Sequence, residues 1–235
     1  MIRLEGVANA NAERKAAAYY LETRPDIRAL VNARGKRILD VGCAAGELGR
    51  ALKQAVAREV VGIERASEAA TLAKESLDRV FVSDVENISL PVDDEGFEYI
   101  IFADILEHTA DPWSVLGSYR RYLKPDGCVV ASIPNIRFYA VIARLIFNRW
   151  DYRESGILDH THLRFFTLPT IKEMFARSGY RIDRVDSKYR LFEDQSRIGR
   201  IGAFANRWFC RLIARLPWRH FFTFQYLVVA RKADD

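Results

Sequence analysis

LDVGCAAGELG, residues 39–49, runs from a short apolar segment directly into a helical pattern. Its small residues let the backbone turn tightly, and the first N–H groups of the following helix face whatever binds there. The next apolar segment ends at Glu64, about twenty residues later, where a carboxylate can accept both hydroxyls of a ribose. The loop alone also fits a plain strand–turn–helix connection. Together with Glu64 it predicts a nucleotide-like ligand.

Around this loop, short segments rich in Val and Ile alternate with helical patterns of about ten residues. The predicted strands are residues 37–41, 60–64, 80–82, 99–103 and 128–133, and the predicted helices are 47–57, 67–76 and 112–123. This alternation indicates a doubly wound α/β fold, a mostly parallel sheet that binds ligands beyond the carboxyl ends of its strands. Residues 181–189 and 222–229 predict a late antiparallel strand pair.

The composition suits one domain over residues 1–235, because 49% of the residues are hydrophobic and 29% are charged. These values exclude a disordered chain and collagen. The three cysteines (Cys43, Cys128 and Cys210) show no metal-like spacing and are too few for a disulfide framework. The first residues lack the apolar core of a signal peptide, and no apolar run approaches the roughly 20 residues that span a bilayer. We therefore expect a cytoplasmic protein.

The glycine loop resembles motif I, D-x-G-x-G-x-G, of class I S-adenosylmethionine-dependent methyltransferases, with Ala44 in place of the middle glycine. The resemblance continues through Glu64, the SDVE loop at 83–86, the ADILEH segment at 103–108 and the LKPDG turn at 123–127. It implies a Rossmann-like fold with S-adenosylmethionine as the cofactor. The implied cofactor-binding residues are Asp40, Gly42, Ala44, Gly46, Glu64, Arg65, Asp84, Val85, Ala103 and Asp104.

A nicotinamide-dependent dehydrogenase would share the glycine loop and the acid after the second strand. Asp84, the acidic segment after residues 99–103 and the LKPDG turn favour the methyltransferase instead. No separate substrate domain follows, as most dehydrogenases would require. We therefore keep the dehydrogenase only as a weaker alternative.

The segment after the fourth strand lacks the Asn/Asp-Pro-Pro-Tyr-type motif of DNA and protein amide methyltransferases, so O-methylation of a small molecule is favoured. A hydroxyl acceptor needs a base, and His108 is one candidate because imidazole titrates near neutral pH. GILDHTHLRFFT, residues 156–167, supplies two more candidate bases, His160 and His162. The His-x-His spacing offers no third ligand nearby, so no metal is predicted.

An HxHLRFFT-like segment resembles a bacterial subgroup of these methyltransferases associated with sugar, polysaccharide and lipid-linked glycan pathways. In that subgroup the segment belongs to the acceptor pocket, which implies that Arg164 holds an anionic group and that Asp159 orients a histidine. YYLETRP, residues 19–25, resembles the subgroup's opening helices (about 8–34). The implied acceptor-binding residues are Tyr20, Arg24, Asn135 and Arg164. Residues 135–167 are expected to cap the acceptor, and 135–152 alternatively form a homodimer contact.

Residues 195–220 contain six arginines and no acid, which exceeds the whole net charge of +5. Most of these arginines lie beside an apolar arc with Trp208 at helical spacing, which predicts an amphipathic insert (about 190–220) on an anionic membrane surface. A solvated surface helix and a nucleic-acid contact are the alternatives.

The first hypothesis is therefore an S-adenosylmethionine-dependent methyltransferase that O-methylates a sugar or lipid-linked glycan hydroxyl at the inner membrane face. The alternatives are an RNA or other small-molecule methyltransferase and a non-catalytic S-adenosylmethionine-binding or scaffold protein. No appended RNA-binding module supports nucleic acid as the partner. The acids Glu64 and Asp84 argue against the scaffold.

Overall fold

The computed structural model describes residues 23–86, 89–92, 94–191, 206, 209–210, 212–216 and 218–233. Its strands are β1 (Arg37–Val41), β2 (Glu59–Glu64), β3 (Arg79–Val82), β4 (Phe97–Ala103), β5 (Leu123–Pro134), β6 (Tyr180–Tyr189) and β7 (Thr223–Lys232). Its α-helices are α2 (Pro25–Arg28), α3 (Glu47–Gln54), α4 (Ser67–Ala73), α5 (Pro112–Tyr119), α6 (Tyr139–Ile146) and α7 (Leu168–Arg177). Three short 3-10 turns complete the described elements: η1 (Leu106–His108), η2 (Arg120–Tyr122) and η3 (Arg219–Phe221).

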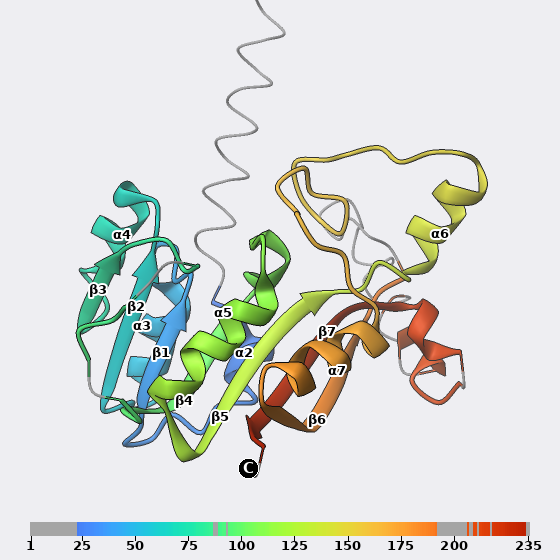
Figure 1. Cartoon of the computed structure of the whole chain (residues 1–235). Helices are drawn as coiled ribbons and strands as arrows, with labels where there is room; N and C mark the ends of the chain where they lie inside the picture. The colour runs from blue at the N-terminus through green and yellow to red at the C-terminus, as the bar shows by residue number, and fades with distance from the viewer. Residues whose placement is uncertain are drawn as a thin grey trace, which may run out of the picture.

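The strands form one sheet in the order β3-β2-β1-β4-β5-β7-β6 (Figure 1). Neighbouring strands among the first five pair in parallel, and β7 pairs antiparallel with both β5 and β6. This topology confirms the predicted doubly wound sheet with its late antiparallel pair. Because β1 and β4 are adjacent while the chain runs outward from β1 through β2 to β3, the strand order reverses between them. In this class of sheet ligands bind at that reversal.

Helices cover both faces of the sheet, because successive side chains of a strand point to opposite sides. Leu39 belongs to one hydrophobic cluster with Val115 of α5 and Phe175 of α7. Its neighbour Ile38 belongs to a second cluster with Leu48 of α3. Figure 1 shows α5 and α7 on the near face of the sheet, with α3 behind it. Each fully buried Leu, Ile or Phe contributes roughly 1.5–3 kcal/mol, so this alternation fixes the register of every central strand.

Several predicted boundaries differ from the structure by a few residues, and the two largest differences lie around the start of β5. The helix expected over 112–123 ends at Tyr119, since residues 120–122 tighten into η2 and Leu123 already begins β5. The LKPDG turn expected before the fifth strand lies inside β5. Phe97 pairs with Leu123 and Tyr99 with Cys128, so residues 124–127 are accommodated as a bulge in the β4–β5 ladder.

A third, smaller cluster holds the segment after β5, away from the main core. Phe138 and Val141 at the start of α6 pack with Ile157, Leu158 and Phe224. In Figure 1, α6 stands apart from the sheet on the side of the carboxyl end of β5. Among the residues that the structure describes, no helix is long and apolar enough to cross a membrane.

Candidate functional site

The loop after β1 turns through three residues in the left-handed region of backbone space. These are Gly42 (φ 73°), Ala44 (φ 50°) and Gly46 (φ 84°). Gly42 N–H and Cys43 N–H both donate to the carbonyl of Ile63, at 2.8 and 2.9 Å, which binds the loop to the end of β2. A side chain at Gly42 would meet the side chain of Ile105. The loop is therefore tight and packed, and Ala44 occupies a position where glycine has the lower strain.

Glu64 lies at the end of β2 and braces this loop. Its carboxylate accepts the backbone N–H of Ala44 at 3.0 Å and that of Ala66 at 2.8 Å. A carboxylate offers about four lone-pair positions, so two more remain for the hydroxyls predicted to bind here. The acid predicted for the ribose thus also connects the glycine loop to the start of α4.

Asp40 is almost fully buried at the end of β1, where it is 1% exposed. Within the described part of the chain, its Oδ2 atom has no hydrogen-bond partner. Burial raises the pKa of Asp40 to about 7; the Arg24 guanidinium opposes this rise and the Glu64 carboxylate adds to it. A buried, unpaired carboxylate is costly by itself and suits a cationic group of a ligand.

The loop after β3 carries Asp84 and Val85 close to the segment that follows β4. Asp84 accepts the N–H of Glu86 at 2.9 Å, and Arg65 approaches the Asp84 carboxylate at 3.9 Å. Both side chains are exposed enough to contact a ligand. Glu86 in turn accepts the N–H of Ala110 at 3.0 Å, which fixes this loop against the one that follows η1.

At the end of β4, Ala103 is followed by Asp104, whose φ is 58°. The Asp104 carboxylate pairs with Arg24 at 2.6 Å, accepts the hydroxyl of Ser132 at 2.8 Å and accepts the amide of Gln225. Arg24 is buried and also pairs with Asp26 at 3.1 Å. The structure therefore uses Arg24, predicted to bind the acceptor, to lock the start of the domain onto β4. Sequence reasoning missed Ser132 and Gln225, since nothing in the chain order links them to Asp104.

Three further predicted acceptor residues are placed as follows. Asn135 is fully buried. Its amide donates to the carbonyls of His220 and Thr223 at 3.0 and 2.8 Å, which occupies both N–H groups. Contact with an acceptor would require their release, so the geometry favours a structural role at the junction of β5 and β7. Tyr20 lies outside the described residues. Arg164 is exposed and donates to the carbonyl of Ala110 at 3.0 Å.

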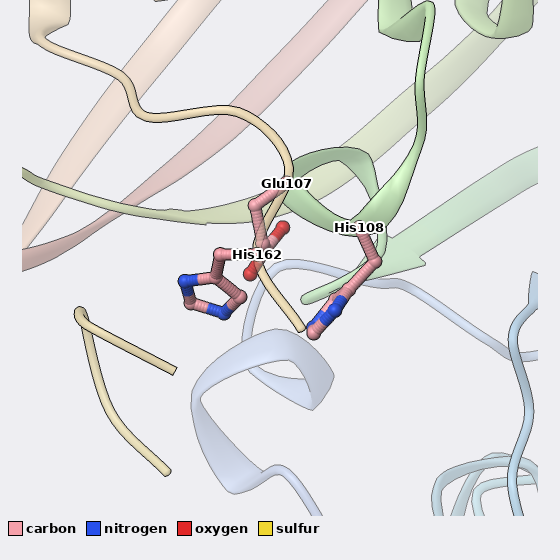
Figure 2. Close-up of side chains that lie close together, drawn as sticks. All are labelled: Glu107, His108 and His162. Atoms are coloured by element: carbon pink, nitrogen blue, oxygen red, sulfur yellow. The ribbon is translucent and has the colours of Figure 1, made fainter. Parts of the chain in front are cut away.

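The segment 159–167 docks on η1 through its backbone. The N–H groups of Leu163 and Arg164 both donate to the carbonyl of Glu107, at 2.8 and 3.0 Å. The docking brings His162 beside His108, with ring centroids 4.7 Å apart. Figure 2 shows the Glu107 carboxylate lying between the two rings. One potential ligand atom from each of these three side chains lies within 4.8 Å of the others.

Two of the three predicted bases therefore belong to one group, and His160 does not. The ring of His160 is exposed, and its Nδ1 faces the carbonyl of Arg153 at 3.2 Å. Asp159 accepts the N–H and the hydroxyl of Thr161, at 2.8 and 2.7 Å, and Thr161 contacts His108. Asp159 therefore reaches His108 only through Thr161, and its carboxylate lies 3.7 Å from Nδ1 of His160. Its role in orienting a histidine stays a prediction.

Glu107 is the main residue that the sequence analysis left out of the site. It is 1% exposed, and burial together with the nearby Asp104 carboxylate raises its pKa well above the usual value. Burial and the neighbouring His108 ring lower the pKa of His162, which keeps that imidazole neutral. The adjacency of Glu107 to His108 is visible in the sequence, but only the fold shows that both side chains meet His162.

The basic insert lies mostly outside the described residues, including Arg197, Arg200, Arg207 and Arg211. Within the described part, residues 209–210 and 212–213 are helical, and Ile213 is buried. Leu212 and Trp218 are about half exposed, at 48% and 52%. The membrane contact through this insert stays a prediction.

Residues 10–185, three quarters of the chain, match the methyltransferase domain family. The chain belongs to that family. It is 27% identical over 175 residues to the ubiquinone biosynthesis O-methyltransferase of Cereibacter sphaeroides, an alignment that covers 73% of this chain and 70% of the relative. The Haemophilus ducreyi protein of the same name is 34% identical over 110 residues, which cover 43% of this chain and 46% of that protein.

Solved structures share the fold of this methyltransferase. An S-adenosylmethionine-dependent methyltransferase from Mesorhizobium loti superposes with a TM-score of 0.61 at 19% identity, covering 88% of this chain and 96% of that one. A second, from Archaeoglobus fulgidus, gives a TM-score of 0.61 at 19% identity, covering 94% of each chain. The cofactor is S-adenosylmethionine. The residues fit it, because the Glu64 carboxylate has acceptor positions left for ligand hydroxyls and the buried Asp40 carboxyl has an Oδ2 atom without a partner among the described residues.

Proposed function

We propose that this methyltransferase O-methylates a sugar or lipid-linked glycan hydroxyl at the cytoplasmic face of a membrane. The observation that carries the proposal is the group of Glu107, His108 and His162, which gathers proton-accepting side chains beside the end of β4. Hydroxyl oxygen is a weak nucleophile until its proton is removed, so this chemistry requires such a group close to the cofactor.

The residues divide the work between binding and deprotonation. Asp40, the glycine loop, Glu64 and Asp84 hold the cofactor, which supplies an activated methyl group when it is bound. His162, kept neutral by burial, accepts the acceptor's proton or passes it to His108. His160 takes no part, since its exposed ring has Nδ1 against the backbone carbonyl of Arg153 and lies outside the group.

An apolar surface next to this group supports an acceptor with a lipid portion. We call it the α6 patch: Leu145, Ile146, Phe147, Trp150 and Tyr152. Phe147 is 76% exposed and Ile146 75%. The ring centroids of Trp150 and Phe165 are 5.3 Å apart, and those of Phe165 and His162 are 6.3 Å apart. A continuous aromatic path thus leads from the patch to the proposed site of deprotonation, and this supports the predicted cap over residues 135–167.

The curated relatives favour a second candidate acceptor, a phenolic hydroxyl of a ubiquinone precursor, because they are named for that pathway. Both candidates combine a hydroxyl with an apolar chain, and the α6 patch supports either. They differ at the reacting end, which is a saturated, polar sugar in one and a flat aromatic ring in the other.

The experiment is a transfer assay with methyl-labelled S-adenosylmethionine against nucleotide sugars, lipid-linked glycans, polyprenylated phenols and RNA, with product identified by mass spectrometry. Label on a glycan hydroxyl supports the first proposal, and label on a phenol alone replaces it with the second. Label on RNA alone would refute both. Flotation with anionic vesicles tests the membrane face: loss of binding in Phe147→Ser, or in a chain without residues 195–220, supports it. Recovery of the wild type in the unbound fraction refutes it.

A further inference from the structure

We propose that Glu107, His108 and His162 form a binding site for a divalent first-row transition-metal ion. The inference rests on the proposed function and deepens it, since the ion would act on the same acceptor hydroxyl. With the ion bound, His108 and His162 serve as its ligands, and the ion in place of a free imidazole would promote loss of the hydroxyl proton. The group comes from two segments more than fifty residues apart, which meet because Leu163 N–H and Arg164 N–H both donate to the carbonyl of Glu107. Backbone hydrogen bonds thus place His162 against η1 independently of any side-chain pairing.

The carboxylate of Glu107 is the strongest sign of a missing partner. It is 1% exposed, and among the described residues neither of its oxygens has a hydrogen-bond partner. Leaving a buried carboxylate unpaired costs several kcal/mol, and proteins normally pair such groups or use them to coordinate metals. Figure 2 shows the carboxylate pointing into the space between the two imidazoles, where a cation would neutralise it.

Both histidines are oriented as metal ligands usually are. Nδ1 of His162 faces the carbonyl oxygen of Ile157 at 3.0 Å. Nδ1 of His108 faces both the carbonyl oxygen of Thr161 at 3.3 Å and its hydroxyl oxygen at 3.0 Å, and that hydroxyl donates its own proton to Asp159. A carbonyl accepts only, so each Nδ1 carries the proton and donates it, which leaves the Nε2 lone pair of each ring for an ion. Metal-binding histidines almost always donate their other N–H to a carbonyl or carboxylate in this way.

The distances and the ligand types set the class of ion. Ligands about 2.1 Å from a shared ion lie at most about 4.2 Å apart, so small side-chain rotations would close the group from its present 4.8 Å limit. Two imidazoles and one carboxylate suit Zn²⁺, Fe²⁺, Co²⁺ or Mn²⁺, whereas Mg²⁺ and Ca²⁺ prefer oxygen ligands alone. Three protein ligands leave at least one coordination position, and an acceptor hydroxyl bound there would lose its proton more readily.

The test uses the full chain without a polyhistidine tag, stripped with a chelator and then titrated with Co²⁺. Bound Co²⁺ shows visible absorption bands whose strength depends on its ligands, so the readout does not require turnover. We expect one ion per chain, and at least tenfold weaker binding in His162→Ala, His108→Asn and Glu107→Gln. His220→Ala removes a histidine that faces Tyr226 in another part of the fold, and it should bind Co²⁺ as the wild type does.

Glu107→Gln also separates loss of a ligand from loss of folding. The amide has nearly the same shape as the carboxyl group and cannot ionise in the buried site, so the ion-free variant should melt no lower than the ion-free wild type while it fails to bind Co²⁺. Wild-type chain that takes up no Co²⁺, or Glu107→Gln and His162→Ala that bind it as tightly as the wild type, would overturn the site. Methyl transfer that persists after chelation would refute the ion's role and leave the proposed function standing. Co²⁺ binding without methyl transfer to any hydroxyl would do the reverse.

Discussion

The loop after β1 and the segment 159–167 both carry predicted site residues, but they are held in different ways. The first is fixed by local strand ends, through the carbonyl of Ile63 and the carboxylate of Glu64. The second is fixed by a distant part of the chain, through the carbonyls of Glu107 and Ala110. The positions of the site residues in the loop after β1 follow from the strand order. The roles of the residues in 159–167 depend on a contact with a part of the chain that is distant in sequence.

The contrast is sharpest between the two histidines of 159–167, which stand two residues apart and face different partners. We expect His162→Ala to lower kcat by about 10²–10³-fold, because it removes a group positioned to accept or relay the hydroxyl proton. His160→Ala should change kcat less than about threefold, since the His160 ring is exposed and its Nδ1 faces the backbone carbonyl of Arg153. Both variants should bind S-adenosylmethionine as the wild type does. Steady-state methyl-transfer assays measure kcat of both variants. An equal loss of kcat in the two variants would mean that the docking of 159–167 does not decide which histidine acts.

In the first loop, Glu64→Ala should have the next largest effect. The loss of an anionic acceptor for ligand hydroxyls costs about 1.5–3 kcal/mol, so the Kd for S-adenosylmethionine should rise about 10- to 100-fold. Turnover at saturating cofactor should remain close to the wild-type value. Calorimetry measures the affinity, with Glu64→Gln as the isosteric variant that keeps the side-chain length. An unchanged Kd in both variants would mean that Glu64 does not bind the cofactor. Its role would then be only to accept the N–H groups of Ala44 and Ala66.

Most of the fold could be predicted from the sequence, because parallel strands buried on both faces appear as separate Val- and Ile-rich runs. All seven predicted strands are present, and even the order of the cofactor loops follows from the βαβ rule. The errors lie where local pattern and tertiary pairing compete. LKPDG has the composition of a turn, yet pairing with β4 draws it into β5 as a bulge.

The acceptor side could be predicted only in part. The sequence analysis predicted His108, His160 and His162 as separate candidate bases, and only the backbone contact to Glu107 shows that His162 lies beside His108. Asn135 and Arg24 looked available for a ligand because chain order does not reveal that His220, Thr223, Asp26 and Asp104 occupy them. A polar residue at a strand end can thus either bind a ligand or stabilise the fold. Its partners from distant parts of the chain decide between these two roles.

Asp40 tests whether the first loop carries a charge reserved for its ligand. Its pKa of about 7 in the folded chain lies above the ordinary value, so between pH 4 and 7 the folded state holds a proton that the unfolded state has lost. The free energy of unfolding therefore falls as the pH rises through this window. Asp40→Asn lacks this term, so its stability relative to the wild type should rise by about 2 kcal/mol from pH 5.5 to 8. Urea titrations of both ligand-free proteins at each pH measure this difference in the free energy of unfolding. If the difference did not change with pH, Asp40 would be ionised throughout the range and the prediction would be wrong.

The smallest expected effect concerns the one departure from the glycine pattern in the first loop. Ala44 has φ 50°, a conformation that costs an L-residue about 1–2 kcal/mol and glycine almost nothing. Glycine also gains freedom in the unfolded chain, which offsets part of the relief, so Ala44→Gly should raise the free energy of unfolding by about 0.5–1 kcal/mol. Ala45→Gly, one residue further along, is the control: Ala45 is not among the non-glycine residues with positive φ, so that variant should lose stability. If both variants were destabilised alike, Ala44 would carry no backbone strain, and the loop would be shaped by side-chain packing instead of by the strand ends.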